Sequence, residues 1–105
     1  MFELMVRARL CMEGKATSRG LHRAAVAHVS ASAQARAKER LLPLLTEGEA
    51  EVFRRGRNTK PHSVPKGAKR EEYQAATGLE ALFGWLYLRG ETVRLNELFE
   101  RIMEE

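Results

Sequence analysis

The sequence predicts an all-α protein, a helical bundle of about six helices. Apolar residues recur at three- and four-residue spacing through most of the 105 residues, and no segment shows the alternation of a strand. Capping residues, glycines and prolines divide these stretches into helix-sized segments. A chain of this length is near the lower limit for a self-sufficient core, so we expect one domain over residues 1–105 that associates with a second copy.

The first half of the chain predicts three helices, over residues 2–12, 19–28 and 31–42. A glycine follows the first helix, Ser18 is the expected N-cap of the second, and Pro43 lies just beyond the third.

The second half predicts three more helices. Thr46 and Glu49 form a capping box that opens a helix carrying Val52 and Phe53. A long helix is expected over residues 69–89, ending before a glycine that can adopt the left-handed conformation. The last helix is amphipathic and is expected to turn five apolar residues inward: Val93, Leu95, Leu98, Phe99 and Ile102.

The most informative residue is Glu80, the only charged residue between Ala75 and Leu88. No residue three or four positions away is basic, so its own helix supplies no ion-pair partner. A buried carboxylate without a partner is costly, and it normally protonates, finds a cation or binds a metal. An Arg from another helix is the structural explanation, and a bound metal is the functional one.

Glycines in the same helix predict close packing. Gly78 and Gly84 each cost roughly 1 kcal/mol relative to Ala inside a helix, so we expect another backbone to approach here, across a dimer axis. Four large residues are expected in the core or an interface: Phe83, Trp85, Leu86 and Leu88.

Residues 54–70 form a basic segment with seven Lys or Arg and no acid. Its Gly, Asn, Pro and Ser content predicts an exposed loop rather than a helix. Guanidinium and ammonium groups suit phosphate oxygens, so nucleic acid is the expected partner, and an idle solvated loop is the alternative. The candidate RNA-binding residues in this segment are Arg54, Arg55, Arg57, Asn58, Lys60, His62 and Lys66.

Composition narrows the remaining possibilities. The net charge is +4, and every acidic residue is Glu. Cys11 alone cannot form an internal disulfide, and we find no apolar span of membrane length and no signal peptide, so we expect a cytoplasmic protein with no membrane partner. Cys11 is expected in the core, because no two of Cys11, His28 and His62 have the close spacing of a zinc site.

Several motifs together resemble one family. The run TGLEALFGWLY at 77–87 resembles the second signature of ribonuclease III catalytic domains, and RRGRN-K-H-VPK across 54–66 resembles the Mini-ribonuclease III branch. LHRAAVAHVSASAQA at 21–35 and FELMVR at 2–7 agree with the same branch.

This resemblance implies a homodimeric, Mg²⁺-dependent endoribonuclease that cleaves double-stranded RNA without an attached double-stranded-RNA-binding domain. The implied substrate is the precursor of 23S ribosomal RNA, with room for assistance by a ribosomal protein. Glu80 would be the catalytic metal ligand, because Mg²⁺ prefers oxygen ligands and needs only one or two carboxylates. His28 and Gln34 would be further RNA contacts.

The sequence departs from the family at its start. The first signature resembles Gly-Asp-Ala-Val-Tyr/Phe-Glu, with the Asp as a metal ligand, and Met1-Phe2-Glu3 aligns with its last three residues. The Asp would stand two positions before Met1, and the sequence contains no Asp at all. Either the start was assigned too late, or the chain is a truncated or inactive form. Thr77 stands where longer ribonuclease III enzymes have a second Asp, which is a trait of the Mini branch.

Three hypotheses follow. The first is the ribonuclease, and the second is a catalytically inactive RNA-binding dimer of the same fold. The third is a helical DNA-binding or protein-interaction module, which would leave Glu80 without a role. The codons upstream of Met1 separate the first two: an in-frame Gly-Asp-Ala favours the enzyme, and a stop codon favours the inactive form.

Overall fold

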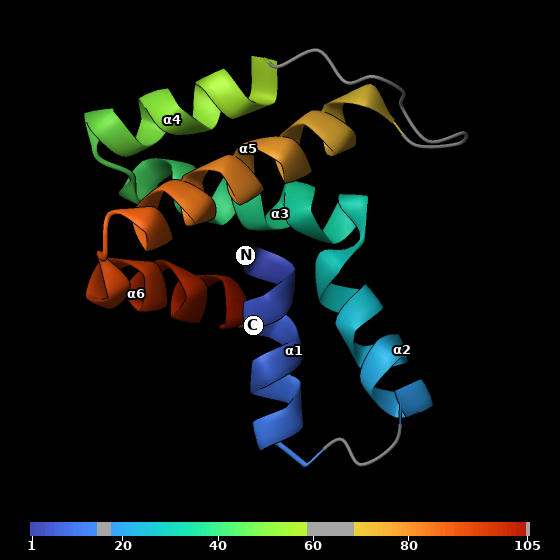
Figure 1. Ribbon diagram of the computed structural model, residues 1–105. Coiled ribbons are helices and arrows are strands. Elements are labelled where there is room, and N and C mark those ends of the chain that lie inside the picture. The colour runs from blue at the N-terminus through green and yellow to red at the C-terminus, as the bar shows by residue number, and fades with distance from the viewer. Residues whose placement is uncertain (15–17, 59–68, 105) are drawn as a thin grey trace.

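The computed structural model describes residues 1–14, 18–58 and 69–104, which form six α-helices, a short 3-10 turn and no strand (Figure 1). The predicted all-α bundle is therefore confirmed. The helices are α1 (Phe2–Met12), α2 (Ser18–Val29), α3 (Ala31–Leu41), α4 (Glu47–Asn58), α5 (Arg70–Leu88) and α6 (Thr92–Met103), and the 3-10 turn covers Leu42–Leu44. None of these helices combines the length and the apolar character needed to cross a bilayer.

Local signals set most of the helix ends. Gly14 and Gly90 follow α1 and α5 with positive φ angles of 86° and 72°, which glycine adopts without steric cost. The predicted capping box opens α4: the Glu49 N–H donates to Thr46 Oγ1 over 3.2 Å, and the Thr46 N–H donates to Glu49 Oε1 over 3.0 Å. The N-cap predicted at Ser18 falls on a side chain outside the described part of the chain.

The prediction of a loop from residue 54 onward was wrong for its first five residues. Helix α4 continues to Asn58. Glu51 forms ion pairs with Arg54 and Arg55 at helical spacing, and Gly56 packs against α5, so these contacts outweigh the weak helix propensity of glycine and asparagine.

Helix α5 lies at the centre of the molecule, with α4 along one side and α3 on another (Figure 1). The core beneath it includes a group of three aromatic rings. The Phe2 ring meets Phe83 edge-on with centroids 5.5 Å apart and Phe99 with centroids 6.1 Å apart. Because Phe2 is the first residue of α1, this contact fixes the start of that helix against α5 and α6.

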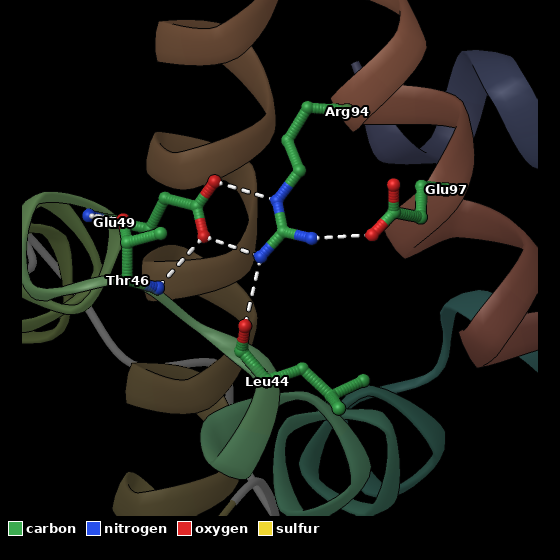
Figure 2. Close-up of polar contacts among 5 residues, drawn as sticks. All are labelled: Leu44, Thr46, Glu49, Arg94 and Glu97. Carbon is green, nitrogen blue, oxygen red and sulfur yellow. Dashed lines mark hydrogen bonds and ion pairs between the residues drawn. The ribbon is translucent and has the colours of Figure 1, made fainter.

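Helix α6 is tied to α4 by one ion pair (Figure 2). The Arg94 guanidinium donates from Nε to Glu49 Oε2 and from a terminal nitrogen to Oε1, both over 2.8 Å. It also donates to the Leu44 carbonyl over 2.8 Å and to Glu97 over 2.6 Å. The bonds from Arg94, with those of Thr46, hold the pKa of the buried Glu49 carboxyl below its ordinary value.

Three side chains predicted to be inside or at an interface face solvent in the described chain. Cys11 is exposed because it follows the buried Leu10 and turns away from the core by one helical step. Val93 is 81% exposed, since it precedes the inward stripe that begins at Leu95. Leu88 is 84% exposed at the end of α5, where the core has already ended.

Candidate functional site

The Glu80 carboxylate lies at the N-terminus of α1. Its Oε2 accepts a hydrogen bond from the Met1 amino group over 2.7 Å and from the Phe2 N–H over 3.2 Å, and its Oε1 accepts from the Glu3 N–H over 3.4 Å. The first N–H groups of a helix have no partner within it and carry partial positive charge, so a carboxylate is stabilised there. The partner of Glu80 is therefore a helix start, and not the Arg from another helix that the sequence suggested.

Glu80 is also less buried than its apolar surroundings predicted. Leu79, Leu82 and Phe83 are fully buried, while the Glu80 side chain is 38% exposed. Phe83 lies one turn after Glu80 and contacts the same start of α1. Leu79 and Leu82 turn further into the core, so Glu80 lies on the edge between the α1 contact and solvent. The carboxylate is thus held in place by its donors and remains reachable by a ligand.

The groups around Glu80 supply some, but not all, of the oxygen ligands that a hard divalent cation requires. Mg²⁺ takes oxygen ligands, keeps several waters and needs only one or two carboxylates. The neighbouring carboxylate of Glu3 bonds the Arg7 guanidinium over 3.0 and 3.1 Å. No group of three or more His, Cys or Glu side chains in residues 1–14, 18–58 and 69–104 could hold a metal. Glu80 would supply one carboxylate, and a second ligand would have to come from elsewhere.

The first part of the predicted basic segment, residues 54–58, belongs to helix α4. Arg54 donates to Glu51 Oε2 over 2.7 Å and Arg55 to Glu51 Oε1 over 3.1 Å. These bonds, that of Arg55 first, lower the pKa of the Glu51 carboxyl. Residues 54–70 contain no acidic residue, but Glu51, one helical turn before them, neutralises part of the charge of Arg54 and Arg55.

The cations of α4 also point in different directions. Phe53 and Gly56 are buried against α5, so the exposed Arg54 and Arg55 lie on the outer side of the helix. Arg57 is half-buried at the edge of the α5 contact, and its Nε donates to Asn58 Oδ1 over 3.3 Å. Lys60, His62 and Lys66 lie outside the described residues.

Helices α4 and α5 meet through two glycines. A Cβ on Gly56 would lie 2.5 Å from the Ala81 Cβ and 3.2 Å from both the Thr77 carbonyl oxygen and the Gly78 Cα. A Cβ on Gly78 would lie 2.7 Å from the Phe53 ring. The tight packing predicted at Gly78 is confirmed, and it comes from the Phe53 ring of α4 in the same chain.

The second glycine of that prediction behaves differently. A Cβ on Gly84 would meet nothing within 4 Å inside the described chain. No neighbouring backbone among the described residues therefore requires a glycine at this position, and the expected approach across a dimer axis stays a prediction.

The two RNA contacts predicted in α2 and α3 have different surroundings. Gln34 is only 7% exposed, and its Nε2 donates to the Val29 carbonyl over 2.9 Å, so it joins α2 to α3 from inside. The packing of α3 turns this side chain inward, and an RNA contact by Gln34 stays a prediction. His28 is half-exposed and lines a cavity of about 20 Å³ with Arg36 and Arg40.

Two contacts at this site were not found from the sequence. The pairing of Glu51 with Arg54 and Arg55 is visible as helical spacing once α4 is extended to Asn58. The contact of Gly56 with Ala81 joins residues far apart in the chain, and only the glycine itself could have suggested it.

Known proteins resemble the chain over most of its length. The ribonuclease III domain family matches residues 1–91. The Mini-ribonuclease 3 of Symbiobacterium thermophilum is 48% identical over 100 residues, which cover 95% of this chain and 77% of that protein. The Mini-ribonuclease 3 of a Thermoanaerobacter species is 39% identical over 107 residues, which cover 99% of this chain and 75% of that protein. A crystal structure of a Fusobacterium nucleatum protein has the same fold, with a TM-score of 0.84 and 23% identity over 98% of this chain and 82% of that one.

Proposed function

The chain belongs to the ribonuclease III family, in its Mini-ribonuclease 3 branch, and on that premise we propose that it is an endoribonuclease that hydrolyses double-stranded RNA with Mg²⁺. The family assignment read from residues 77–87 is confirmed. The observation that carries the proposed activity is the Glu80 carboxylate, which is oriented by three N–H donors and is still accessible.

Glu80 is proposed as the catalytic metal ligand. Bound Mg²⁺ would lower the pKa of a ligated water and neutralise charge on the phosphate. The protein contributes position: the Phe2 and Glu3 N–H groups fix the two carboxylate oxygens of Glu80 on the surface of α5. The family pattern would add an Asp two positions before Met1, and the Met1 nitrogen already lies 2.7 Å from Glu80.

The cations of α4 and of the segment that follows it are proposed to hold RNA phosphates. Double-stranded RNA hides its base edges in a deep and narrow major groove, so a small helical protein recognises mainly backbone shape and charge. Arg57 follows Gly56, which packs against α5, the helix that carries Glu80. The proposed contacts also include Arg54, Arg55, Asn58, His28, Gln34, Lys60, His62 and Lys66.

The finer details of the activity follow from the resemblance. We propose that the protein acts in the cytoplasm as one catalytic domain on the precursor of 23S ribosomal RNA, as a homodimer and with a ribosomal protein as an assisting partner. Exposed apolar side chains support the homodimer: Leu88 and Val93 are 84% and 81% exposed, and Gly84 stands in open space one turn before Leu88.

A second function has its own support. The sequence contains no Asp, and residues 1–14, 18–58 and 69–104 contain no group of three or more His, Cys or Glu side chains that could hold a metal ion. Both observations favour a catalytically inactive RNA-binding dimer of the same fold.

One experiment separates the two functions. Three chains are compared: the chain as printed, the chain with Gly-Asp-Ala added before Met1, and a control with Gly-Asn-Ala added there. Each is incubated with double-stranded RNA, and with one of its strands alone, over a series of Mg²⁺ concentrations. We expect Mg²⁺-dependent cleavage of the duplex only by the chain with the added Asp. Duplex binding without cleavage by all three chains would support the inactive dimer, and no duplex binding by any chain would contradict both functions.

A further inference from the structure

We propose that Gly56 is a positioning residue: its contact with α5 fixes the Arg57 guanidinium beside the turn of helix that carries Glu80, where it can grip an RNA phosphate. This inference rests on the proposed function. It explains how Arg57 of α4 is placed near the surface around Glu80. Neither the sequence motifs nor the family assignment accounts for this placement.

The first observation is the closeness of the two helices. A methyl group at position 56 would overlap the Ala81 Cβ at 2.5 Å, well inside the roughly 3.5–4.0 Å at which two carbon atoms pack. The Ala81 Cβ is bonded directly to the backbone and cannot rotate away. Any side chain at position 56 therefore has to push α4 off α5 by about 1 Å, the difference between these distances.

The second observation is the part of α5 that Gly56 touches. Its nearest neighbours are Ala81, Gly78 and Thr77, and Glu80 belongs to the same turn of α5. Arg57 follows Gly56 by one residue, so its backbone lies about 1.5 Å along α4 from the point that meets this turn. The Glu80 carboxylate itself extends from this turn to the start of α1. A change in the spacing at Gly56 would move Arg57 relative to that turn.

The third observation is the difference in ion pairing among the arginines of α4. Arg54 and Arg55 both bond Glu51 and lie on the outer side of the helix. Arg57 is half-buried next to the packed Gly56, and its Nε donates to the neutral amide oxygen of Asn58. Of the arginines in the described part of α4, Arg57 is the one that forms no ion pair with a carboxylate of residues 1–14, 18–58 and 69–104.

The chain offers a matched control for the test. Gly48 lies in the same helix, and a Cβ there would meet nothing within 4 Å. Gly48→Ala and Gly56→Ala make the same chemical change in the same helix, and only the second alters the crossing with α5. A difference between the two variants therefore reports on the contact and not on the loss of a glycine.

The experiment measures the affinity of the full chain for a double-stranded RNA as a function of salt concentration, well below the melting temperature of each variant. The variants are Gly48→Ala, Gly56→Ala, Arg57→Gln and the double variant Gly56→Ala/Arg57→Gln. We expect Gly48→Ala to match the wild type. Gly56→Ala and Arg57→Gln should each lower the salt slope by about 0.7–0.9, the value of one phosphate contact. The double variant should bind no more weakly than either single variant, because both remove the same contact.

A purely structural role predicts another pattern. Gly56→Ala would then melt at a lower temperature while its folded form kept the wild-type affinity and slope, and this result would overturn the proposal. Additive effects in the double variant would overturn it as well. A wild-type chain that does not bind the duplex would instead contradict the proposed function, and the positioning role with it.

A second variant covers the case in which Gly56→Ala does not fold. Gly56→Ala/Ala81→Gly removes the 2.5 Å overlap and leaves two tight 3.2 Å contacts with backbone atoms, the Thr77 oxygen and the Gly78 Cα, so α4 stays displaced by a smaller amount. In this background, adding Arg57→Gln should lower the salt slope less than it does in the wild type. A drop as large as in the wild type would show that the crossing does not position Arg57.

Discussion

Arg94 binds both carboxylate oxygens of Glu49, although the two residues come from different helices and are 45 positions apart (Figure 2). The Glu49 side chain is 6% exposed, and that of Arg94 is 25% exposed. The planar guanidinium matches the carboxylate in a bidentate arrangement that Lys could not reproduce. The pair closes α6 onto the start of α4.

Replacing Arg94 by Ala should lower the free energy of unfolding by about 2–3 kcal/mol, because the buried Glu49 carboxylate would lose its cation. Chemical denaturation at neutral pH measures this change. Arg101→Ala is the control: Arg101 is an exposed cation of the same helix, and its loss should change stability by less than about 0.5 kcal/mol. Equal effects of the two variants would contradict the assigned role of the pair.

The contribution of this ion pair should depend on pH. The hydrogen bonds from Arg94 lower the pKa of Glu49 from its ordinary value of 4.5. The unfolded chain then takes up the proton at higher pH than the folded chain, so the stabilisation is complete above about pH 4.5 and is lost as the pH falls through the lower folded pKa. The stability difference between wild type and Arg94→Ala should therefore shrink between pH 5 and pH 3, roughly the range of this titration. A difference that is constant over this range would contradict the shifted pKa.

Glu80→Gln, made in the chain extended by Gly-Asp-Ala, should reduce Mg²⁺-dependent cleavage by at least about a hundredfold. The affinity for duplex RNA should change by less than about twofold, because the substitution removes a metal ligand and no RNA contact. Single-turnover cleavage and binding assays measure the two effects. Gln keeps an acceptor oxygen for the N–H groups of α1, whereas Glu80→Ala should also destabilise the fold by about 1 kcal/mol. Full activity in either variant would remove Glu80 from the mechanism.

Replacing Arg55, Arg57 and Lys60 by Ala should weaken duplex binding about equally for all sequences and lower the salt slope by up to about 0.7–0.9 for each phosphate that is no longer bound. The melting temperature should barely change, since the described side chains of Arg55 and Arg57 are not part of the core. Salt titrations and melting curves measure the two properties. Arg101→Ala controls for the loss of a positive charge elsewhere. An unchanged slope in a folded triple variant would mean that this segment is only a solvated surface.

Leu88→Arg should convert the proposed homodimer to a monomer at micromolar concentration. Leu88 is 84% exposed and lies one turn after Gly84, so a charge there would face the proposed partner. Sedimentation analysis measures the mass of the particle. Met12→Arg is the control, because Met12 is 88% exposed at the far end of α1 and its replacement should leave the dimer intact. A monomeric wild type would contradict the homodimer itself.

The helices could be predicted because their signals are local. The apolar periodicity, the Thr46–Glu49 capping box and the glycine after α5 act within a few residues of the feature they determine. The predicted end of α4 is too early, since Gly56 packs against α5, a helix that is distant in sequence. Periodicity also does not resolve side chains at the edge of an apolar stripe, which is why Cys11 and Val93 were assigned to the wrong side.

The sequence could predict which residue is central to the candidate site, but not which groups that residue contacts. Glu80 is conspicuous in the sequence because an ion in an apolar helix requires a partner. Its partners are Met1, Phe2 and Glu3, and the Phe2 N–H is 78 positions away in the chain. Contacts of this range depend on how the helices pack. The inward orientation of Gln34 depends on packing in the same way, because a polar residue near a helix start is equally common on a surface.

The contact between Met1 and Glu80 has a practical consequence for anyone producing this protein. The first nitrogen of the printed chain lies 2.7 Å from the Glu80 carboxylate, so a peptide fused ahead of Met1 would leave the fold directly over that carboxylate. An oligohistidine tag at this end would bring imidazole groups to a carboxylate and could create an accidental site for nickel or zinc. Glu104 follows the C-terminal end of α6 and is exposed. A tag attached beyond it leaves the Met1, Phe2 and Glu3 nitrogens that hold the Glu80 carboxylate unaltered.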